Sequence, residues 1–185
     1  MIIEEKEIKI LLSKEEYNRV AALFRWDKEF TQTNYYYGNN ETVDSDNTTI
    51  RVREKEGKFF LQVKIPEQKK GSLHIKKEYE EQVSNIPGYI SRLELERLTG
   101  QIFNKDVILL GKLITIRRES QLSNDILICL DKNGYLNNTD YEIEMEFNKE
   151  YPHEIINMLE KLGIKTNKEI MGKFSRFIKK YKSEC

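Results

Sequence analysis

Apolar and polar residues alternate along much of this chain, which is the pattern of β-strands that bury one face and keep the other polar. Near the start, Ile8 and Ile10 share one face, whereas Glu7 and Lys9 share the opposite face. Eight segments show this alternation, and we predict a strand in each of them. The segments are 3–12, 32–38, 48–56, 58–65, 73–82, 107–119, 125–131 and 140–147.

Helical periodicity separates some of these strands and closes the chain. Ser13 is the predicted N-cap of the first helix, because Glu15 and Glu16 would then lie in its first turn, near the positive end of the helix dipole. Pro87 and Gly100 bound the second helix. The four predicted helices cover about 14–24, 86–100, 151–162 and 169–181.

Turn signals and strand order predict the fold class. Pro66 should stop the strand before it, because proline cannot donate to a strand ladder. Asn133-Gly134 should form the core of a hairpin turn. Because most strands follow other strands, we expect an α+β fold whose sheet closes into a barrel or divides into two packed sheets. The length of 185 residues, with no linker or repeat, predicts a single domain over 1–185.

The composition narrows the classes of partner. Lys+Arg and Asp+Glu both number 31, and this balance argues against a general binder of nucleic acid or of acidic membranes. No apolar run approaches the roughly 20 residues of a membrane-spanning helix. Cys129 and Cys185 form no CxxC pair, and no signal peptide is evident, so we expect free thiols in a reducing, cytoplasmic protein.

The polar faces of the predicted strands carry charges that are sorted by sign. Positions 142, 144 and 146 all hold carboxylates, whereas positions 51 and 53 both hold guanidinium groups. Residues i and i+2 of a strand lie about 6.6 Å apart, so like charges there repel unless a metal ion or opposite charges offset them. The charged residues of these faces are Glu5, Glu7, Lys9, Arg51, Arg53, Lys64, Lys76, Glu78, Glu80, Arg117, Asp131, Glu142, Glu144 and Glu146.

Two interpretations of these faces remain open from periodicity alone. They are the solvated outer faces of amphipathic strands, or they line an interior that contains both signs of charge. A lined interior would suit a polyphosphate with Mg²⁺ or Mn²⁺, since lysine and arginine bind phosphate oxygens and carboxylates bind hard divalent cations. A second metal ion could activate the attacking water.

Eight charged elements follow one another in a definite order. They are Glu5-x-Glu7-x-Lys9, Arg51-x-Arg53, Lys64, Lys76-x-Glu78-x-Glu80, Arg117, Asp131, Glu142-x-Glu144-x-Glu146, and Lys173 with Arg176. Over about residues 3–180, this order resembles that of the CYTH superfamily, the triphosphate tunnel metalloenzymes, and especially the small bacterial single-domain members of the YjbK type. Gly38 departs from the pattern, because an acidic residue is common there.

The resemblance implies an eight-stranded antiparallel barrel that forms a tunnel, with helices outside. Members of the superfamily hydrolyse inorganic triphosphate, thiamine triphosphate or nucleoside triphosphates, one branch makes cyclic AMP, and all use divalent metals. The implied substrate-binding residues are Lys9, Arg51, Arg53, Lys64, Lys76, Arg117, Lys173 and Arg176. The implied ligands of one Mg²⁺ or Mn²⁺ ion are Glu5, Glu7, Glu142, Glu144 and Glu146. Glu78, Glu80 and Asp131 would hold a second ion or its water, and with Lys9 they form the implied catalytic set.

Three functions therefore stand at this point. The first is a metal-dependent hydrolase of triphosphates, most simply inorganic triphosphate, in which water attacks the terminal phosphate. The second is an adenylyl cyclase of the CYTH type, and the third is a non-catalytic module that binds polyphosphate or a nucleotide. We expect a monomer or a homodimer that takes a small-molecule triphosphate.

Strand parity makes further predictions about single side chains. Arg117 should point inward and Arg118 outward, because Arg118 shares its parity with Ile114 and Ile116. His74 shares the parity of the charged face, and it lies either near a tunnel mouth or at an exposed strand end. The same parity predicts that Cys129 is a packed small residue.

Overall fold

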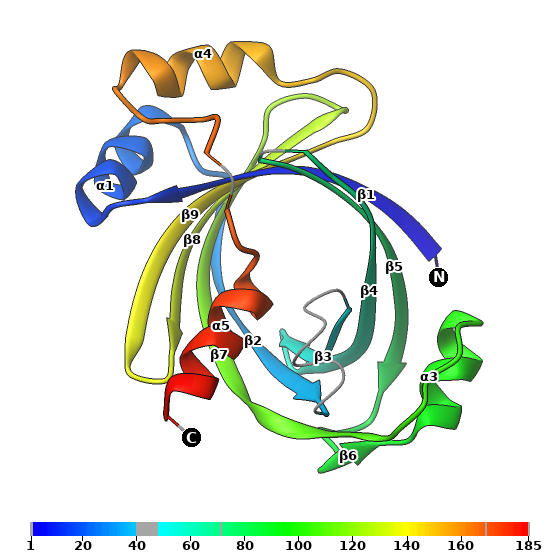
Figure 1. The fold of residues 1–185 in the computed structure, drawn as a ribbon. Coiled ribbons are helices and arrows are strands. Elements are labelled where there is room, and N and C mark those ends of the chain that lie inside the picture. Colours follow the sequence, from blue (N-terminus) through cyan, green and yellow to red (C-terminus); the bar gives the residue numbers. More distant parts are fainter. Residues whose placement is uncertain (1, 40–47, 71, 169, 185) are drawn as a thin grey trace.

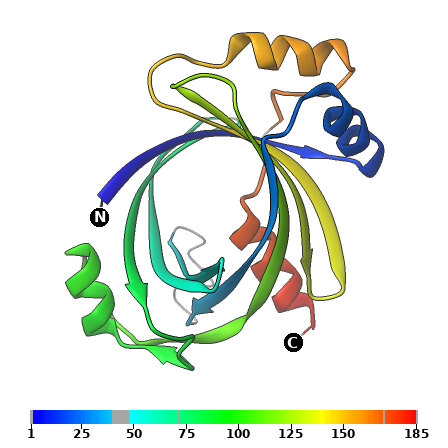
Figure 2. The same ribbon diagram turned by 180° about the vertical axis from the view of Figure 1, so that it is seen from behind.

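The computed structural model describes residues 2–39, 48–70, 72–168 and 170–184, and for 2–5 and 68–70 it describes the backbone alone. Its strands curve around a common axis into a barrel, which Figure 1 shows end-on and Figure 2 shows from behind. The strands are β1 Ile2–Leu12, β2 Lys28–Gly38, β3 Thr49–Lys55, β4 Lys58–Lys70, β5 Leu73–Val83, β6 Tyr89–Ile90, β7 Val107–Gln121, β8 Ile126–Tyr135 and β9 Asn138–Phe147. The helices are α1 Lys14–Leu23, α3 Arg92–Thr99, α4 His153–Lys161 and α5 Lys173–Glu184.

The barrel is an antiparallel sheet of eight strands that closes on itself. The strand order is β2-β3-β4-β5-β1-β9-β8-β7-β6, and pairing of β2 with β7 completes the ring. Closure leaves the eight strands without a free edge, which removes a template for aggregation. The predicted α+β barrel is confirmed, with β6 as one additional short strand that pairs only with β7 among the described residues.

Several predicted boundaries are wrong. The strand expected over 32–38 already begins at Lys28. The helix expected over 86–100 begins only at Arg92, because Tyr89 and Ile90 pair with β7 and Ser91 caps the helix by accepting a hydrogen bond from the Glu94 N–H. The strand β4 continues past Pro66, where a register shift before Gln68 accommodates the missing N–H. The last helix begins at Lys173 rather than near 169.

The hairpin between β8 and β9 turns later than predicted. Asn133 and Gly134 are strand residues paired with β9, and the turn lies at Leu136 and Asn137, whose φ angles are 43° and 55°. Two successive positive φ values are the geometry of a tight hairpin turn, which these residues adopt in place of the expected Asn-Gly pair. The later turn lengthens β8 and places the Asn133 side chain inside the barrel.

The main hydrophobic cores lie outside the barrel, between its outer face and the helices. Ile8 and Ile10 of β1 pack with Val20 of α1 and with Ile155 and Leu159 of α4. Burying each such side chain contributes roughly 1.5–3 kcal/mol. Figure 1 shows α1 and α4 together over one side of the barrel and α3 over another. The outward apolar face of each strand is therefore what attaches these helices, which leaves the polar face inside.

The remaining helix, α5, packs against the inner face of the barrel. Phe174 and Phe177 contact Tyr36, whose ring centroid lies 5.1 Å from each of theirs. Tyr36 pairs with Arg51 across β2 and β3 and with Gly111 of β7. A Cβ at Gly111 would lie 3.0 Å from Phe177 Cζ, so this glycine permits the close approach of the helix. As a result, α5 fills part of the interior.

Coverage of the outer face is incomplete along β7. Ile114 and Ile116 point outward and are 39% and 37% exposed. None of the helices among the described residues is long and apolar enough to cross a membrane.

Candidate functional site

The barrel interior carries the charged residues that the alternation placed on one face. Glu7, Lys9 and Arg117 are each less than 8% exposed, and Asp131 and Glu142 are fully buried. Of the two open interpretations, the structure therefore shows the lined interior. Glu5 lies in β1 opposite Lys76, and its side chain is outside the described part of the chain.

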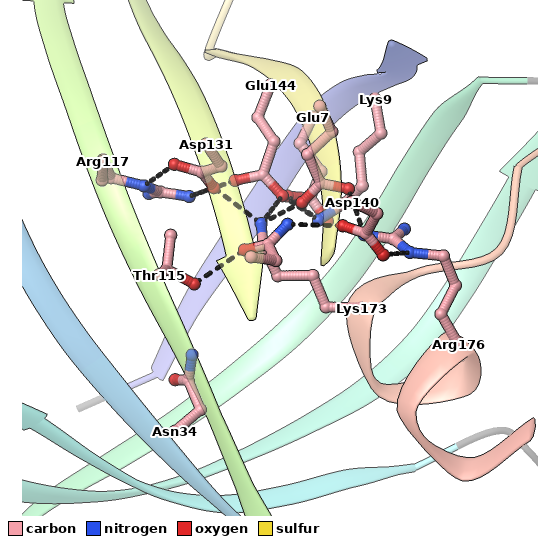
Figure 3. Close-up of polar contacts among 12 residues, drawn as sticks. Glu7, Lys9, Asn34, Thr115, Arg117, Asp131, Asp140, Glu144, Lys173 and Arg176 are labelled. Atoms are coloured by element: carbon pink, nitrogen blue, oxygen red, sulfur yellow. Dashed lines mark hydrogen bonds and ion pairs between the residues drawn. The ribbon is translucent and has the colours of Figure 1, made fainter. Parts of the chain in front are cut away.

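The acidic triad, Asp131, Glu142 and Glu144, comes from the neighbouring strands β8 and β9. Asp131 and Glu142 are directly opposite in the ladder, and one carboxylate oxygen from each member of the triad lies within 4.8 Å of the others. Arg117 of β7 binds Asp131 through two hydrogen bonds of 2.8 and 2.6 Å and also donates to Glu144. Lys173 Nζ pairs with all three carboxylates, and Figure 3 shows it beside Asp131 and Glu144. Two strands thus supply one dense anionic cluster, and β1, β7 and α5 supply its cations.

The cations keep Asp131 and Glu144 ionised despite their burial. For Glu144, burial would raise the pKa, but Lys173, Lys9 and Arg117 outweigh that effect and hold the pKa well below its usual value. The pKa of Asp131 is lowered in the same way, against burial, by Arg117 and Lys173. Burial would lower the pKa of Lys173, but the three carboxylates outweigh that effect and raise the pKa above its usual value. Both signs of charge are therefore present at neutral pH.

A second, mostly basic group lies on β3, β4 and β5. Arg51 Nε donates to Gln62 Oε1 at 2.7 Å, and Lys64 Nζ pairs with Glu78 Oε2 at 2.8 Å. Burial would raise the pKa of Glu78, but Lys64 and Arg51 lower it to about 2. Glu80 accepts a hydrogen bond of 2.5 Å from Gln62 Nε2. This side of the interior thus combines cations with amides and carboxylates that hold them in place.

A cavity of about 270 Å³ lies between the two groups. The structure brings most of the predicted site residues to its wall. The charged lining residues are Glu7, Lys9, Arg51, Arg53, Lys64, Lys76, Arg117, Glu144, Glu146 and Lys173.

Five other predicted residues with described side chains are not among those that line the cavity. They are Glu78, Glu80, Asp131, Glu142 and Arg176. Asp131 groups with Glu142 and Glu144, whereas Glu78 and Glu80 lie on β5, which β1 and β9 separate from β8. The predicted grouping of Asp131 with those two glutamates is therefore not what the geometry shows. Arg176 Nε lies 2.8 Å from Asp140 Oδ2, and its Nη2 lies 2.8 Å from Glu142 Oε2, so this arginine fastens α5 to β9.

Three neutral or weakly charged positions were missed or left undecided by the sequence reasoning. His74 is only 5% exposed and lines the cavity, so the exposed strand end is ruled out. Tyr36 also lines the cavity, and Gln62 orders Arg51. His74 shares the parity of Lys76, and Gln62 that of Lys64, which is a signal that could have found them. Tyr36 lies on β2, where no predicted site residue offered such a signal.

The remaining predictions from parity are confirmed. Arg118 points outward and donates to Glu29 at 2.5 Å, whereas Arg117 is buried inside. Cys129 is fully buried, and its burial raises the pKa of the thiol well above its usual value.

The residues around the triad fit a divalent cation. All the candidate ligand atoms are carboxylate oxygens, which Mg²⁺ and Mn²⁺ prefer. Glu7 Oε1 and Glu142 Oε1 are buried and accept no hydrogen bond from the described residues, although Lys76 Nζ lies 3.8 Å from the first and Lys173 pairs with the second. Buried acceptors without hydrogen bonds are costly, and a metal ion would satisfy them.

Comparison with known proteins agrees with this geometry. The candidate triphosphatase YjbK of Bacillus subtilis (strain 168) is 33% identical over 150 residues, which are 77% of this chain and 76% of that protein. Two solved structures share the fold. A candidate adenylate cyclase from Bacillus halodurans has a TM-score of 0.72 at 24% identity, covering 95% of this chain and 98% of its own. The Hippeastrum protein HpAC1, described as a candidate adenylyl cyclase with a dominant triphosphatase activity, has a TM-score of 0.70 at 21% identity and covers 94% of both chains.

The family profile of the CYTH domain matches residues 4–173, which include every charged strand of the barrel interior. Together with the closed antiparallel barrel and the charged cavity, this match shows that the chain belongs to the CYTH domain family.

Proposed function

We propose that this protein is a divalent-metal-dependent triphosphatase and that inorganic triphosphate is its best substrate. The cavity between the acidic triad and the basic group is the observation that carries the proposal, because it presents phosphate-binding cations and metal-binding carboxylates to one small volume. The 33% sequence identity of the chain to a candidate triphosphatase supports the same reaction class.

The charge of the cavity wall favours a polyanion. Seven lysines and arginines line it, against three carboxylates, which is a surplus of four positive charges. Lysine and arginine on β3, β4 and β5 can contact successive phosphates of a linear chain. Arg51, Arg53, Lys64 and Lys76 are the residues that we assign to this role.

The size of the cavity favours a substrate without a large organic group. A volume of about 270 Å³ lies below the roughly 300–1,000 Å³ of sites that enclose drug-sized ligands. The aromatic lining residues Tyr36 and Phe174 pack against each other. These two features support inorganic triphosphate over a nucleotide, and they disfavour the adenylyl cyclase alternative.

Hydrolysis would rest mainly on positioning and electrostatic stabilisation, as in other phosphoryl transfers. Lys9 and Arg117, beside Glu144, are placed to stabilise charge that develops on phosphate oxygens. We assign Glu7 and the acidic triad to the metal, and we keep Glu5 and Glu146 as further predicted ligands. A bound divalent ion would polarise phosphate oxygens and lower the pKa of a water molecule. For Glu78 and Glu80, a role in holding a second ion or its water remains a prediction.

A phosphate-release assay tests the proposal. Inorganic triphosphate, thiamine triphosphate and ATP are each incubated with the protein and Mg²⁺ or Mn²⁺, and again with EDTA. We expect the highest kcat/KM with inorganic triphosphate and no release in EDTA. Cyclic AMP from ATP would instead establish the cyclase, and no product from any substrate would favour a binding module.

A further inference from the structure

The ammonium group of Lys173 lies where the acidic triad would place a cation. Its Nζ is 2.7 Å from Asp131 Oδ2 and 2.9 Å from Glu144 Oε1, and it also pairs with Glu142 Oε1. One atom of each carboxylate therefore faces the same nitrogen, and Figure 3 shows this for Asp131 and Glu144. Lys173 is only 8% exposed, which is unusual for a lysine and requires close ionic partners.

The fold delivers this ammonium group from α5. Lys173 is the first residue of the helix, and Phe174 and Phe177 anchor the helix on the inner face of the barrel. Residues 170–172 before it are not helical, so Lys173 stands at the start of α5. The flexible four-carbon stem of a lysine lets its ammonium group move while the helix stays in place. Arg176 binds the other oxygen of Glu142, one turn later, and keeps the helix attached.

Electrostatics explains why the position must be filled. Three carboxylates whose oxygens lie within 4.8 Å of one another need a cation in a buried site, and removing the cation from a buried ion pair is strongly destabilising. A divalent metal ion would take the same oxygens, because it too needs anionic oxygen ligands. An ammonium nitrogen and a metal ion cannot occupy one position together.

We propose that Lys173 is the internal counter-ion of the acidic triad in the metal-free protein, and that a divalent ion must displace it in order to bind. This inference rests on the metal site of the proposed function. Lys173 also lines the cavity, so its displaced ammonium group becomes available to a phosphate. Metal and triphosphate then favour each other's binding, and by linkage the coupling is equal in both directions.

Removing the amine should reveal the competition. Mn²⁺ is titrated calorimetrically into wild type, Lys173→Met and Lys180→Met, without substrate. Lys180 is the matched control, because it lies on the same helix and pairs with Glu184, away from the triad. We expect Lys173→Met to bind Mn²⁺ at least tenfold more tightly than the other two proteins, which should agree with each other.

Thermal unfolding gives a second measure on the same variants. In EDTA, the Tm of Lys173→Met should fall by roughly 10 °C, because its buried carboxylates lose their counter-ion. Mn²⁺ should restore most of that loss and raise the Tm of wild type far less. Equal Mn²⁺ affinities in all three proteins, with equal Tm values in EDTA, would overturn the inference while leaving the metal site intact. Absence of Mn²⁺ binding from every protein would overturn the metal site itself, and with it the inference.

A third test uses the wild-type protein, so its result does not depend on whether a variant folds. Acetylation of lysine amines by a succinimidyl ester, followed by mass spectrometry, reports the accessibility of each amine. We expect labelling of Lys173 to be slow in EDTA and to rise several-fold with Mn²⁺, whereas labelling of Lys180 stays constant. An unchanged rate at Lys173 in saturating Mn²⁺ would contradict displacement.

Discussion

The two sides of the barrel interior solve the problem of buried charge in different ways. On the acidic side, each carboxylate of the triad is held by a cation that reaches it from β1, β7 or α5. On the basic side, guanidinium groups are held in large part by neutral amides, as in the contacts of Arg51 with Gln62 and of Arg53 with Asn34. The first side is balanced within the protein, whereas the second retains positive charge for a ligand. Fold stability should therefore depend more on the acidic side, and substrate affinity more on the basic side.

Substitution of Glu144 should have the largest effect, because this residue both stabilises the fold through its ion pairs and is a proposed ligand of the metal. Glu144→Gln leaves Lys9, Arg117 and Lys173 with one fewer anion, which should lower the free energy of unfolding by about 3–5 kcal/mol. Metal-dependent phosphate release should fall at least roughly 100-fold. Urea unfolding and the release assay measure the two effects. The exposed Glu150→Gln serves as control, and wild-type behaviour of Glu144→Gln in both assays would remove the triad from the account.

The ion pair of Glu78 and Lys64 tests the basic side through pH. Because the pKa of Glu78 is lowered from 4.5 to about 2, its stabilising contribution is present above pH 4.5 and is lost as the pH falls toward 2. Glu78→Gln should therefore cost up to about 3 kcal/mol at pH 6 and at least a third less near pH 3. Urea unfolding of both proteins across this range measures the difference. A cost that stays constant with pH would show that the ion pair does not stabilise the fold.

Substitution of Arg53 should separate affinity from stability. Arg53 lines the cavity and donates to the neutral Asn34, a contact that contributes less than the charge-assisted contacts of the acidic triad. We expect kcat/KM for inorganic triphosphate to fall roughly 10–100-fold, the range of a lost charge-assisted contact, with a change in Tm of about 2 °C or less. Arg97→Gln, which breaks the exterior pair of Arg97 with Glu81, is the matched control. Unfolding as severe as that of Glu144→Gln would erase the distinction between the two sides.

The smallest effect concerns reagent access to Cys129, which lies opposite Glu144 in the pairing of β8 with β9. Cys129 is fully buried on β8, and burial raises the pKa of its thiol, so little thiolate is available for reaction. In a Cys185→Ser background, Cys129 of the native protein should react with a disulfide reagent at least roughly 100-fold more slowly than in denaturant. Rapid labelling of the native protein would mean that the barrel opens readily at β8.

Strand alternation was sufficient to predict which side chains share a face, whereas the resemblance to the CYTH superfamily was needed to place the charged face inside a barrel. The period of two put Glu7, Lys9 and Arg117 on the charged face and Arg118 on the other. A strand that buries an apolar face on helices must turn its other face inward once the sheet closes. The N-cap Ser13 was likewise predicted from local sequence, and the structure adds a capping box in which Glu16 accepts from the Ser13 N–H.

The register in which strands pair could not be predicted in this way. Alternation assigns a face but not a register, and the predicted turn at Asn133-Gly134 would have paired Asp131 with a different residue of β9. The turn at Leu136 and Asn137 is what sets Asp131 opposite Glu142. The amphipathic pattern of α5 also could not show that its partner is the inner face of the barrel.

The division between the two sides is tested most directly by crystals grown with Mn²⁺ and a non-hydrolysable imidotriphosphate. Anomalous scattering locates manganese without ambiguity, and ordinary density locates the phosphates. The account predicts manganese against Asp131, Glu142 and Glu144, with phosphates against Arg51, Arg53 and Lys64. Manganese on Glu78 and Glu80 alone, or phosphates outside the barrel, would contradict it.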